Sequence, residues 1–120
     1  MAQSEMPIFT RTFDFLTWLL PVTNHFPRAH RHSFTQRLLD AAFDLRERLE
    51  EANVRQGTAR LERLAQADEA LNKVRLYLRL AERWHWLTPG QYQHVAAMVA
   101  EMGRLLGGWR KKTIDATPSR

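Results

Sequence analysis

The sequence contains no cysteine, which excludes disulfide bonds, thiolate metal ligands and a cysteine nucleophile. Glycine and proline are also sparse, with five of each among 120 residues. There is no glycine-rich loop of the kind that cradles phosphate groups. No stretch alternates apolar and polar residues in the manner of a half-buried strand. These absences exclude a phosphate-loop enzyme and favour an all-α protein.

Long apolar runs are absent as well. The longest is Leu19-Leu20-Pro21-Val22, with Leu16 and Trp18 before it, and it is far too short to cross a bilayer. The first residues, 1–7, lack a basic segment followed by an apolar run, so we expect no signal peptide. We therefore expect a soluble, cytoplasmic protein without a membrane partner.

The five histidines do not occur at metal-ligand spacing. His30 and His32 are two positions apart and would point in different directions on a helix. There is no His-x-x-x-His pair, and no Glu-x-x-His pair of the type found in di-iron bundles. We therefore expect neither a metal site nor another cofactor. The histidines are His25, His30, His32, His85 and His94.

A catalytic constellation is missing too, because no serine, histidine and acidic residue stand at a recognisable spacing. Asp68 precedes Arg75 by two helical turns, and Glu82 also lies among arginines. We interpret Asp68 and Glu82 as ion-pair partners of arginines, and we expect a protein that is not an enzyme. A bundle enzyme that binds a metal or small molecule is a further hypothesis, which a ligand bound to the purified protein would support.

What the sequence has in excess is positive charge. Lysine and arginine total 18 against 13 aspartates and glutamates, which gives a formal net charge of +5 and a pI near 10.4. A charge of this sign favours an anionic partner such as a nucleic acid. A surface that serves only solubility gives the same numbers, so charge alone leaves both interpretations open.

Apolar residues recur at three- and four-residue steps along most of the chain, which indicates helices. Thr88 followed by Pro89 is a strong helix-start signal, a hydroxyl N-cap before a proline at the first helical position. We predict an antiparallel up-down-up-down four-helix bundle as one domain over residues 1–112, with a flexible tail at 113–120. The helices are expected at about residues 8–26, 30–55, 58–86 and 89–112.

The third predicted helix carries two apolar faces. The face that would dock on the bundle core consists of Ala67, Leu71, Val74, Leu78, Ala81 and His85. A second apolar face, which also includes Leu87, is turned away from the first, and a monomeric bundle has no use for it. We therefore predict an oligomer whose subunit interface includes Leu76, Tyr77, Leu80 and Trp84.

The fourth predicted helix carries two glycines one helical turn apart. Gly103 and Gly107 form a small-x-x-x-small pair, which predicts a close approach between two helices of the bundle. Trp109 follows on the apolar face of the same helix, and we predict that it lies in the core.

Two groups of basic residues are candidate sites for an anionic ligand. Arg75, Arg79 and Arg83 form a row of about 12 Å on one sector of the third helix, long enough to follow a few phosphates. Arg28, His30 and Arg31 lie at the expected start of the second helix, where free amides and the helix dipole also favour phosphate. A solvated charged face is the alternative for each group. Binding of this kind would be weakly sequence-specific.

Several stretches, taken together, resemble a known family. They are Pro27-Arg28-Ala29-His30-Arg31, the run from Ala67-Asp68 to Leu71 followed by Arg75-x-x-x-Arg79-Leu80, and Leu87-Thr88-Pro89-x-Gln91 leading to Glu101-x-Gly103-Arg104-Leu105-Leu106-Gly107-Gly108-Trp109. Their order and spacing are similar to those of the accessory variability determinant (Avd) proteins of diversity-generating retroelements, over about Leu19 to Trp109. A broader relative is the four-helix protein encoded in intervening sequences of bacterial 23S ribosomal RNA genes.

This resemblance implies a homopentameric barrel of four-helix bundles with a positive surface and no catalytic activity. The implied partners are the retroelement's reverse transcriptase and nucleic acid, RNA or DNA, during mutagenic retrohoming. Arg75 and Arg79 match the family's helix arginines, at which polymerase and nucleic-acid contacts are expected, and Arg28 and Arg31 match its basic turn. The alternative is the function of the ribosomal intervening-sequence branch, an oligomeric RNA-associated scaffold without a polymerase partner.

Overall fold

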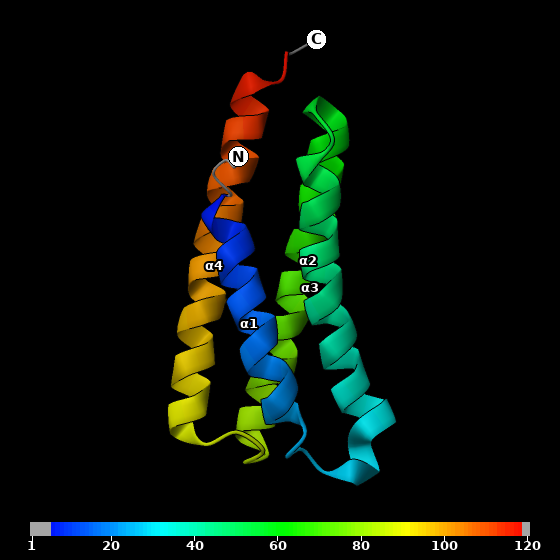
Figure 1. Cartoon of the computed structure of the whole chain (residues 1–120), viewed down its shortest axis with the longest axis vertical. Coiled ribbons are helices and arrows are strands. Elements are labelled where there is room, and N and C mark those ends of the chain that lie inside the picture. The colour runs from blue at the N-terminus through cyan, green and yellow to red at the C-terminus, as the bar shows by residue number, and fades with distance from the viewer. Residues whose placement is uncertain (1–5, 119–120) are drawn as a thin grey trace.

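A computed structural model describes residues 6–118 of the chain, and this part contains four α-helices and no strand. The helices pack side by side into an elongated four-helix bundle in which successive helices run in opposite directions (Figure 1), with extents of 50 × 28 × 21 Å. The expected all-α class is thereby confirmed. Within the described part, no helix combines the length and the apolar character needed to cross a membrane. The helices are α1 (Pro7–Thr23), α2 (Gln36–Asn53), α3 (Gly57–Arg83) and α4 (Pro89–Ala116).

The core lies along the bundle axis, and the apolar faces of all four helices contribute to it. The expected core face of α3 is buried from Ala67 to Ala81, because helical spacing of apolar residues places them on one side. Trp109 of α4 is 6% exposed and meets Phe9 of α1 edge to face, with ring centroids 6.0 Å apart. Trp109 therefore lies in the core, as predicted.

The boundaries of all four helices differ from those expected. Helix α1 ends at Thr23 rather than residue 26, since Pro27 disfavours helical geometry at the buried Phe26. Helix α4 continues to Ala116, through the beginning of the expected flexible tail. Thr113 is buried there and its hydroxyl donates to the Trp109 carbonyl at 2.8 Å, so side-chain burial extends the helix. The last two residues of the expected tail, 119–120, lie outside the described residues.

The start of the second helix is irregular. A 3₁₀ turn, η1 (Arg28–His30), and a π-helical turn, η2 (Arg31–Thr35), precede the regular helix α2. The chain thus becomes helical near residue 30 as expected, but the regular α-helix begins only at Gln36, and η1 does not provide the α-helical N-terminus that was expected to attract phosphate. The π-helical turn accommodates an extra residue per turn, and within it Phe34 and Thr35 are buried.

The C-terminal end of α3 is closed by a Schellman motif. The His85 amide donates to the Glu82 carbonyl at 3.0 Å, and the Trp86 amide donates to the Ala81 carbonyl at 2.8 Å. His85 has φ +65°, in the left-handed region that glycine usually occupies in this motif. The expectation that His85 belongs to the core-facing helix is thus wrong, because the chain turns before it and leaves it exposed. Leu87, beyond the turn, is 2% exposed and enters the core instead of the expected outer face.

Helix α4 begins as its sequence signal predicts. Thr88 is the N-cap, and its side-chain oxygen accepts from the Gln91 amide at 3.0 Å. The Gln91 side chain accepts in return from the Thr88 amide at 2.9 Å, which completes a capping box. The turn between α3 and α4 is thereby fixed on both sides, by the Schellman motif and by this cap.

Candidate nucleic-acid interface

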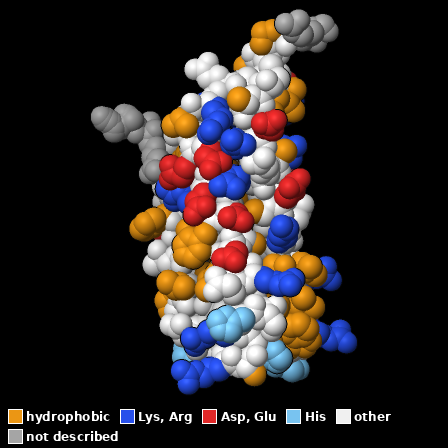
Figure 2. Space-filling model, turned by 90° about the vertical axis from the view of Figure 1, so that its right-hand side faces the viewer, with side chains coloured by type: hydrophobic (Ala, Val, Ile, Leu, Met, Phe, Trp, Pro, Cys, Tyr) orange, Lys and Arg blue, Asp and Glu red, His pale blue; other side chains and the backbone are white. Residues whose placement is uncertain are grey.

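Charges are distributed unequally between the two ends of the bundle. Within residues 6–118, all ion pairs are formed by residues of 46–68 and 101–115. These segments lie in the half of the bundle near the α2–α3 connection or at mid-length. Figure 2 shows acidic and basic side chains interspersed on the upper part of one face, whereas basic and histidine side chains gather at its lower end without acidic ones. Examples of the pairs are Arg46–Glu50 at 2.7 Å, Arg63–Glu51 at 3.1 Å and Arg110–Asp68 at 3.5 Å.

The lower end is formed by the α1–α2 and α3–α4 connections, which lie at the same end of the bundle (Figure 1). We call residues 24–35 and 83–88 the basic end. The stretches that contain them, 15–39 and 83–100, have no aspartate or glutamate and include all five histidines. Local charge at this end is therefore positive, although the chain as a whole is only moderately basic.

The structure brings four of the six predicted binding residues to this end. Arg28, His30 and Arg31 are exposed in η1 and η2, and Arg83 is exposed as the last residue of α3. No ion pair within residues 6–118 involves Arg28, Arg31 or Arg83. Two groups of basic residues that are distant in sequence thus lie at the same end of the bundle and form one cationic surface. From the sequence alone they were two separate candidate sites.

Arg75 and Arg79 lie farther up α3 and border a small groove. The groove has a volume of about 270 Å³ and is lined mainly by apolar residues of α3 and α4. Arg79 is exposed, but Arg75 is half-buried and donates to the Asn72 side chain at 2.8 Å. The three arginines of the row predicted along α3 therefore differ, since Arg75 is half-buried and hydrogen-bonded whereas Arg79 and Arg83 are exposed.

Gly103 of α4 provides the space that Arg75 occupies. A Cβ atom on Gly103 would collide with the Arg75 guanidinium, whereas a Cβ on Gly107 would meet nothing within 4 Å. Gly103 therefore makes room for side chains of α3, which differs from the predicted close approach between two helices. The same prediction for Gly107 is wrong, because Gly107 is exposed.

Asp68 forms an ion pair, but with a different arginine from the one expected. Its carboxylate lies 3.5 Å from Arg110 of α4, and Arg75 bonds to Asn72 instead. The pairing joins two helices, which spacing along a single helix does not reveal. Arg75 is consequently not neutralised by a carboxylate within the described residues.

The residues predicted for a subunit interface divide into two kinds. Leu76 and Trp84 are 53% and 45% exposed, whereas Tyr77 and Leu80 are half-buried and pack against the core. Phe34 of η2 meets Tyr77 and Trp84 edge to face, at 5.7 and 5.4 Å between ring centroids. Part of this apolar face is thus covered by the chain's own π-helical turn.

An aromatic cluster at the basic end is absent from the sequence-based predictions. Trp86 packs against Phe34 at 5.2 Å and against Trp84 at 5.0 Å, and His30 stacks on Trp86 at 5.5 Å with 23° between the rings. Together with Ser33, these residues line an open cavity of about 480 Å³. The sequence signal for this cluster was the concentration of aromatic residues and histidines in both the α1–α2 and the α3–α4 connections. Only the fold shows that the two connections lie side by side.

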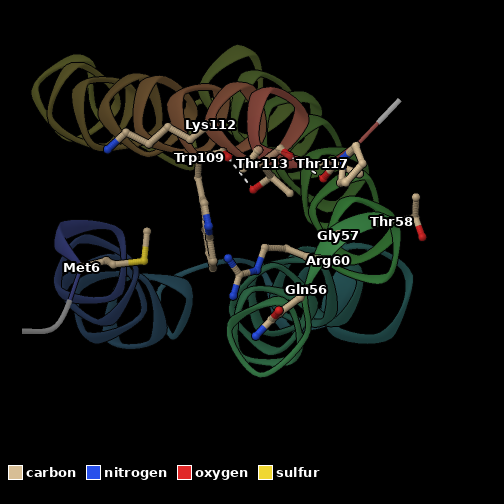
Figure 3. Close-up of a pocket in the computed structure, with 11 residues that line it drawn as sticks. Met6, Gln56, Gly57, Thr58, Arg60, Trp109, Lys112, Thr113 and Thr117 are labelled. Carbon is tan, nitrogen blue, oxygen red and sulfur yellow. Dashed lines mark hydrogen bonds between the residues drawn. The ribbon is translucent and has the colours of Figure 1, made fainter. Parts of the chain in front are cut away.

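A larger cavity of about 730 Å³ opens at the opposite end of the bundle (Figure 3). Arg60 reaches from α3 toward Trp109, with its guanidinium carbon 5.5 Å from the ring centroid. The same guanidinium donates to the Ala52 carbonyl at 2.9 Å and so satisfies the C-terminal end of α2. Arg60 is therefore already engaged in holding three helices together, and Lys112 is the second cation in the lining of this cavity.

An ion pair between Glu101 and Arg104 on α4 alters the titration of both partners. Hydrogen bonds from Arg104, at 2.7 and 2.9 Å, lower the pKa of the Glu101 carboxyl. The same bonds, accepted by Glu101, raise the pKa of Arg104. Both groups lie on the surface outside the basic end. Because Glu101 neutralises Arg104, this arginine is a weaker candidate for binding an anionic ligand.

Comparison with known proteins agrees with the helical architecture and the resemblance seen in the sequence. The model of the bAvd-like family matches residues 6–113. The chain belongs to the bAvd-like family. A solved structure of a protein of unknown function from the S23 ribosomal protein family, from Bacteroides thetaiotaomicron, superposes with a TM-score of 0.79. The two are 17% identical, and the match covers 87% of this chain and 98% of the other, so it establishes a shared fold. No curated protein matches the chain.

Proposed function

We propose that this bAvd-like protein is a non-enzymatic, cytoplasmic accessory protein that binds a retroelement reverse transcriptase and nucleic acid in mutagenic retrohoming. The observation that carries the nucleic-acid part is the basic end, where Arg28, Arg31 and Arg83 have no ion-pair partner in the described chain. Unpaired arginines attract phosphates and gain from releasing the counterions around them. Family membership supports the polymerase partner.

In this proposal the two arginine groups have separate tasks. The basic end contacts the phosphate backbone, which requires little more than clustered cations and gives weak sequence specificity. Arg75 and Arg79 border an apolar groove between α3 and α4, and such a combination suits a protein surface with a carboxylate beside an apolar side chain. We assign the basic end to nucleic acid and this groove to the polymerase.

We further propose that the protein acts as a homo-oligomer, a pentamer by analogy with the family. Leu76 supports an interface on the outer face of α3, because it is a large apolar side chain that is 53% exposed. Leu80 and Tyr77 continue this face toward the core. A ring of such subunits would place several basic ends close together and so increase the affinity for a long polyanion.

A second candidate is favoured by the solved structure of the S23 ribosomal protein family, which shares the fold over nearly its whole length. In that case the protein is an oligomeric RNA-associated scaffold that has no polymerase partner. The gene neighbourhood separates the two: a reverse transcriptase gene with paired template and variable repeats supports the first, and an insertion within a 23S ribosomal RNA gene supports the second.

The decisive experiment compares cations of the basic end with paired arginines. In the triple variant Arg28→Ala, Arg31→Ala, Arg83→Ala, we expect at least about tenfold weaker binding of labelled RNA or DNA. We also expect a salt slope lower by about 0.7 (single strand) to 0.9 (DNA duplex) for each phosphate that is no longer neutralised. The matched control removes the same charge from ion-paired residues, with Arg48→Ala, Arg104→Ala and Arg110→Ala. Fluorescence anisotropy at several salt concentrations measures both. Equal losses in the two triples would reduce the effect to net charge and overturn the assigned surface.

The polymerase partner is tested separately, by co-purification of the reverse transcriptase with the tagged protein. We expect Arg75→Ala with Arg79→Ala to reduce the recovered polymerase, and Arg104→Ala, an exposed arginine paired with Glu101, to leave it unchanged. Recovery unaffected by the double variant would contradict the assignment of the groove. Nucleic-acid binding by a protein that recovers no reverse transcriptase would favour the scaffold function.

A further inference from the structure

We propose that the aromatic cavity at the basic end binds one unpaired base of a single-stranded nucleic acid by stacking. This inference rests on the proposed nucleic-acid binding, and it adds that the bound nucleic acid is single-stranded at the cavity. The cavity, of about 480 Å³, is lined by His30, Ser33, Phe34, Trp84 and Trp86. Its size falls within the range of about 300–1,000 Å³ that is usual for small-molecule sites.

The aromatic rings of this cavity leave part of their surface exposed, so a further ring can stack on them. Phe34 is 7% exposed and forms the floor, whereas Trp84 is 45% exposed and Trp86 is half-buried. His30 already stacks on Trp86 at 5.5 Å with nearly parallel rings, which shows that a flat heteroaromatic ring fits against that indole. An incoming base can use the free surface of Trp84 in the same way.

Backbone motifs on both sides hold the rings in place before any ligand arrives. The Schellman motif fixes Trp84 and Trp86 on either side of His85, whose left-handed conformation is strained for a residue with a side chain. The π-helical turn carries Phe34, whose ring meets both indoles edge to face. A preformed cavity loses little conformational entropy on binding, which favours recognition of a flexible strand.

The charges around the cavity select an anionic strand as the occupant. Arg83 directly precedes Trp84 and Arg31 directly follows His30, so each of these two cavity residues has an arginine next to it in the chain. No aspartate or glutamate occurs within residues 15–39 or 83–100. A base in the cavity would bring its own phosphate and the next one toward these arginines. A base in an intact duplex is stacked on its neighbours, so the cavity requires a base that is unpaired.

The test compares two strands of equal charge, a short oligothymidylate and an abasic deoxyribose-phosphate strand of the same length, with an oligouridylate as the RNA arm. We expect the wild-type protein to bind the base-bearing strands about tenfold more tightly than the abasic strand, because one stacked base contributes about 1–3 kcal/mol. Equal affinity for all three would overturn the base site while leaving the proposed nucleic-acid binding intact. Absence of binding to any strand, at low salt, would overturn the proposed function itself.

Two variants locate the site. We expect Trp84→Leu to remove most of the preference for the base-bearing strands without changing the salt slope, and Trp84→Tyr to retain most of it. The matched control is Trp18→Leu, since Trp18 is half-buried and also contacts a histidine, His94 at 5.4 Å, but does not line the cavity. A preference unchanged in Trp84→Leu, or lost equally in Trp18→Leu, would overturn the assignment. A change of subunit number in Trp84→Leu, measured by light scattering, would identify the cavity as an interface and overturn it as well.

Discussion

The two ends of the bundle hold their arginines in different ways. Near the α2–α3 connection, Arg46 and Arg60 are tied to carbonyls and aromatic rings of neighbouring helices. At the basic end, Arg28, Arg31 and Arg83 are exposed and take part in no ion pair within residues 6–118. The same residue type therefore joins helices at one end and presents free charge at the other. The partners of the arginines, and not their number, indicate where an anion would bind.

Energetics explain why such a difference can persist. An ion pair at a protein surface contributes only about 0–1 kcal/mol, so the paired end gains modestly from each pair. Clustered cations repel one another, and the basic end carries this cost while no anion is bound. A ligand that neutralises them would relieve the repulsion and stabilise the fold in proportion to its concentration.

The largest expected effect tests whether the aromatic cluster supports the basic end. Phe34→Ala should lower the free energy of unfolding by about 3 kcal/mol, because a nearly buried ring in contact with four other aromatic residues is removed and a cavity remains. Chemical denaturation followed by circular dichroism measures the change.

The matched control for this prediction is Phe43→Ala on α2. Phe43 is 41% exposed and does not belong to the aromatic cluster, so its loss should cost less than about 1 kcal/mol. Similar losses for Phe34→Ala and Phe43→Ala would show that the cluster is not a stabilising centre. The basic end would then differ from the opposite end only in its unpaired arginines and not in a stabilising aromatic cluster.

A smaller effect concerns Arg75, which lies between the two ends. Like Arg46 and Arg60 it is held by a hydrogen bond, and like the arginines of the basic end it has no ion-pair partner within residues 6–118. Gly107→Ala should stabilise α4 by about 0.5–1 kcal/mol, since its Cβ would enter open space and alanine favours helices. Gly103→Ala should gain nothing, because its Cβ would expel the Arg75 guanidinium and put at risk the hydrogen bond to Asn72, of about 1 kcal/mol. Thermal unfolding of the two variants gives the comparison.

The functional consequence of this pair of variants is separate from stability. If the space left by the missing side chain of Gly103 orients Arg75 toward a partner, Gly103→Ala should reduce recovery of the reverse transcriptase. Gly107→Ala should leave that recovery unchanged. Equal stabilisation by the two alanines would mean that Arg75 moves aside without loss. Arg75 would then belong with the free arginines and not with those that are held.

Features that depend on one helix could be predicted from the sequence. The buried run from Ala67 to Ala81 follows from three- and four-residue spacing, and the Thr88 cap follows from its neighbours Pro89 and Gln91. Both are local, because one helical face or one turn decides them. The four-helix architecture follows from several such patterns in succession.

Features that join separate helices could not be predicted in this way. The partner of Asp68 is Arg110 on another helix, although Arg75 has the better spacing along α3. The cavity depends on the π-helical turn that positions Phe34 and on the Schellman motif that separates Trp84 from Trp86. Each is a departure from regular helix, and periodicity contains no signal for it. The candidate site was therefore predictable as a set of cations but not as one surface around aromatic rings.

The smallest expected effect concerns the Glu101–Arg104 pair, which represents the paired arrangement in its exposed form. Arg104 lowers the pKa of Glu101 in the folded protein, so the stabilisation is present above the pKa of the unfolded state and is lost as pH falls through the folded-state pKa. Glu101→Gln should therefore lower Tm slightly at neutral pH and converge with the wild type in acid. Thermal unfolding between neutral and acidic pH measures the difference. A difference that stayed constant across this range would show that the Glu101–Arg104 pair contributes no charge-dependent stability. The pair would then matter only because it neutralises the charge of Arg104.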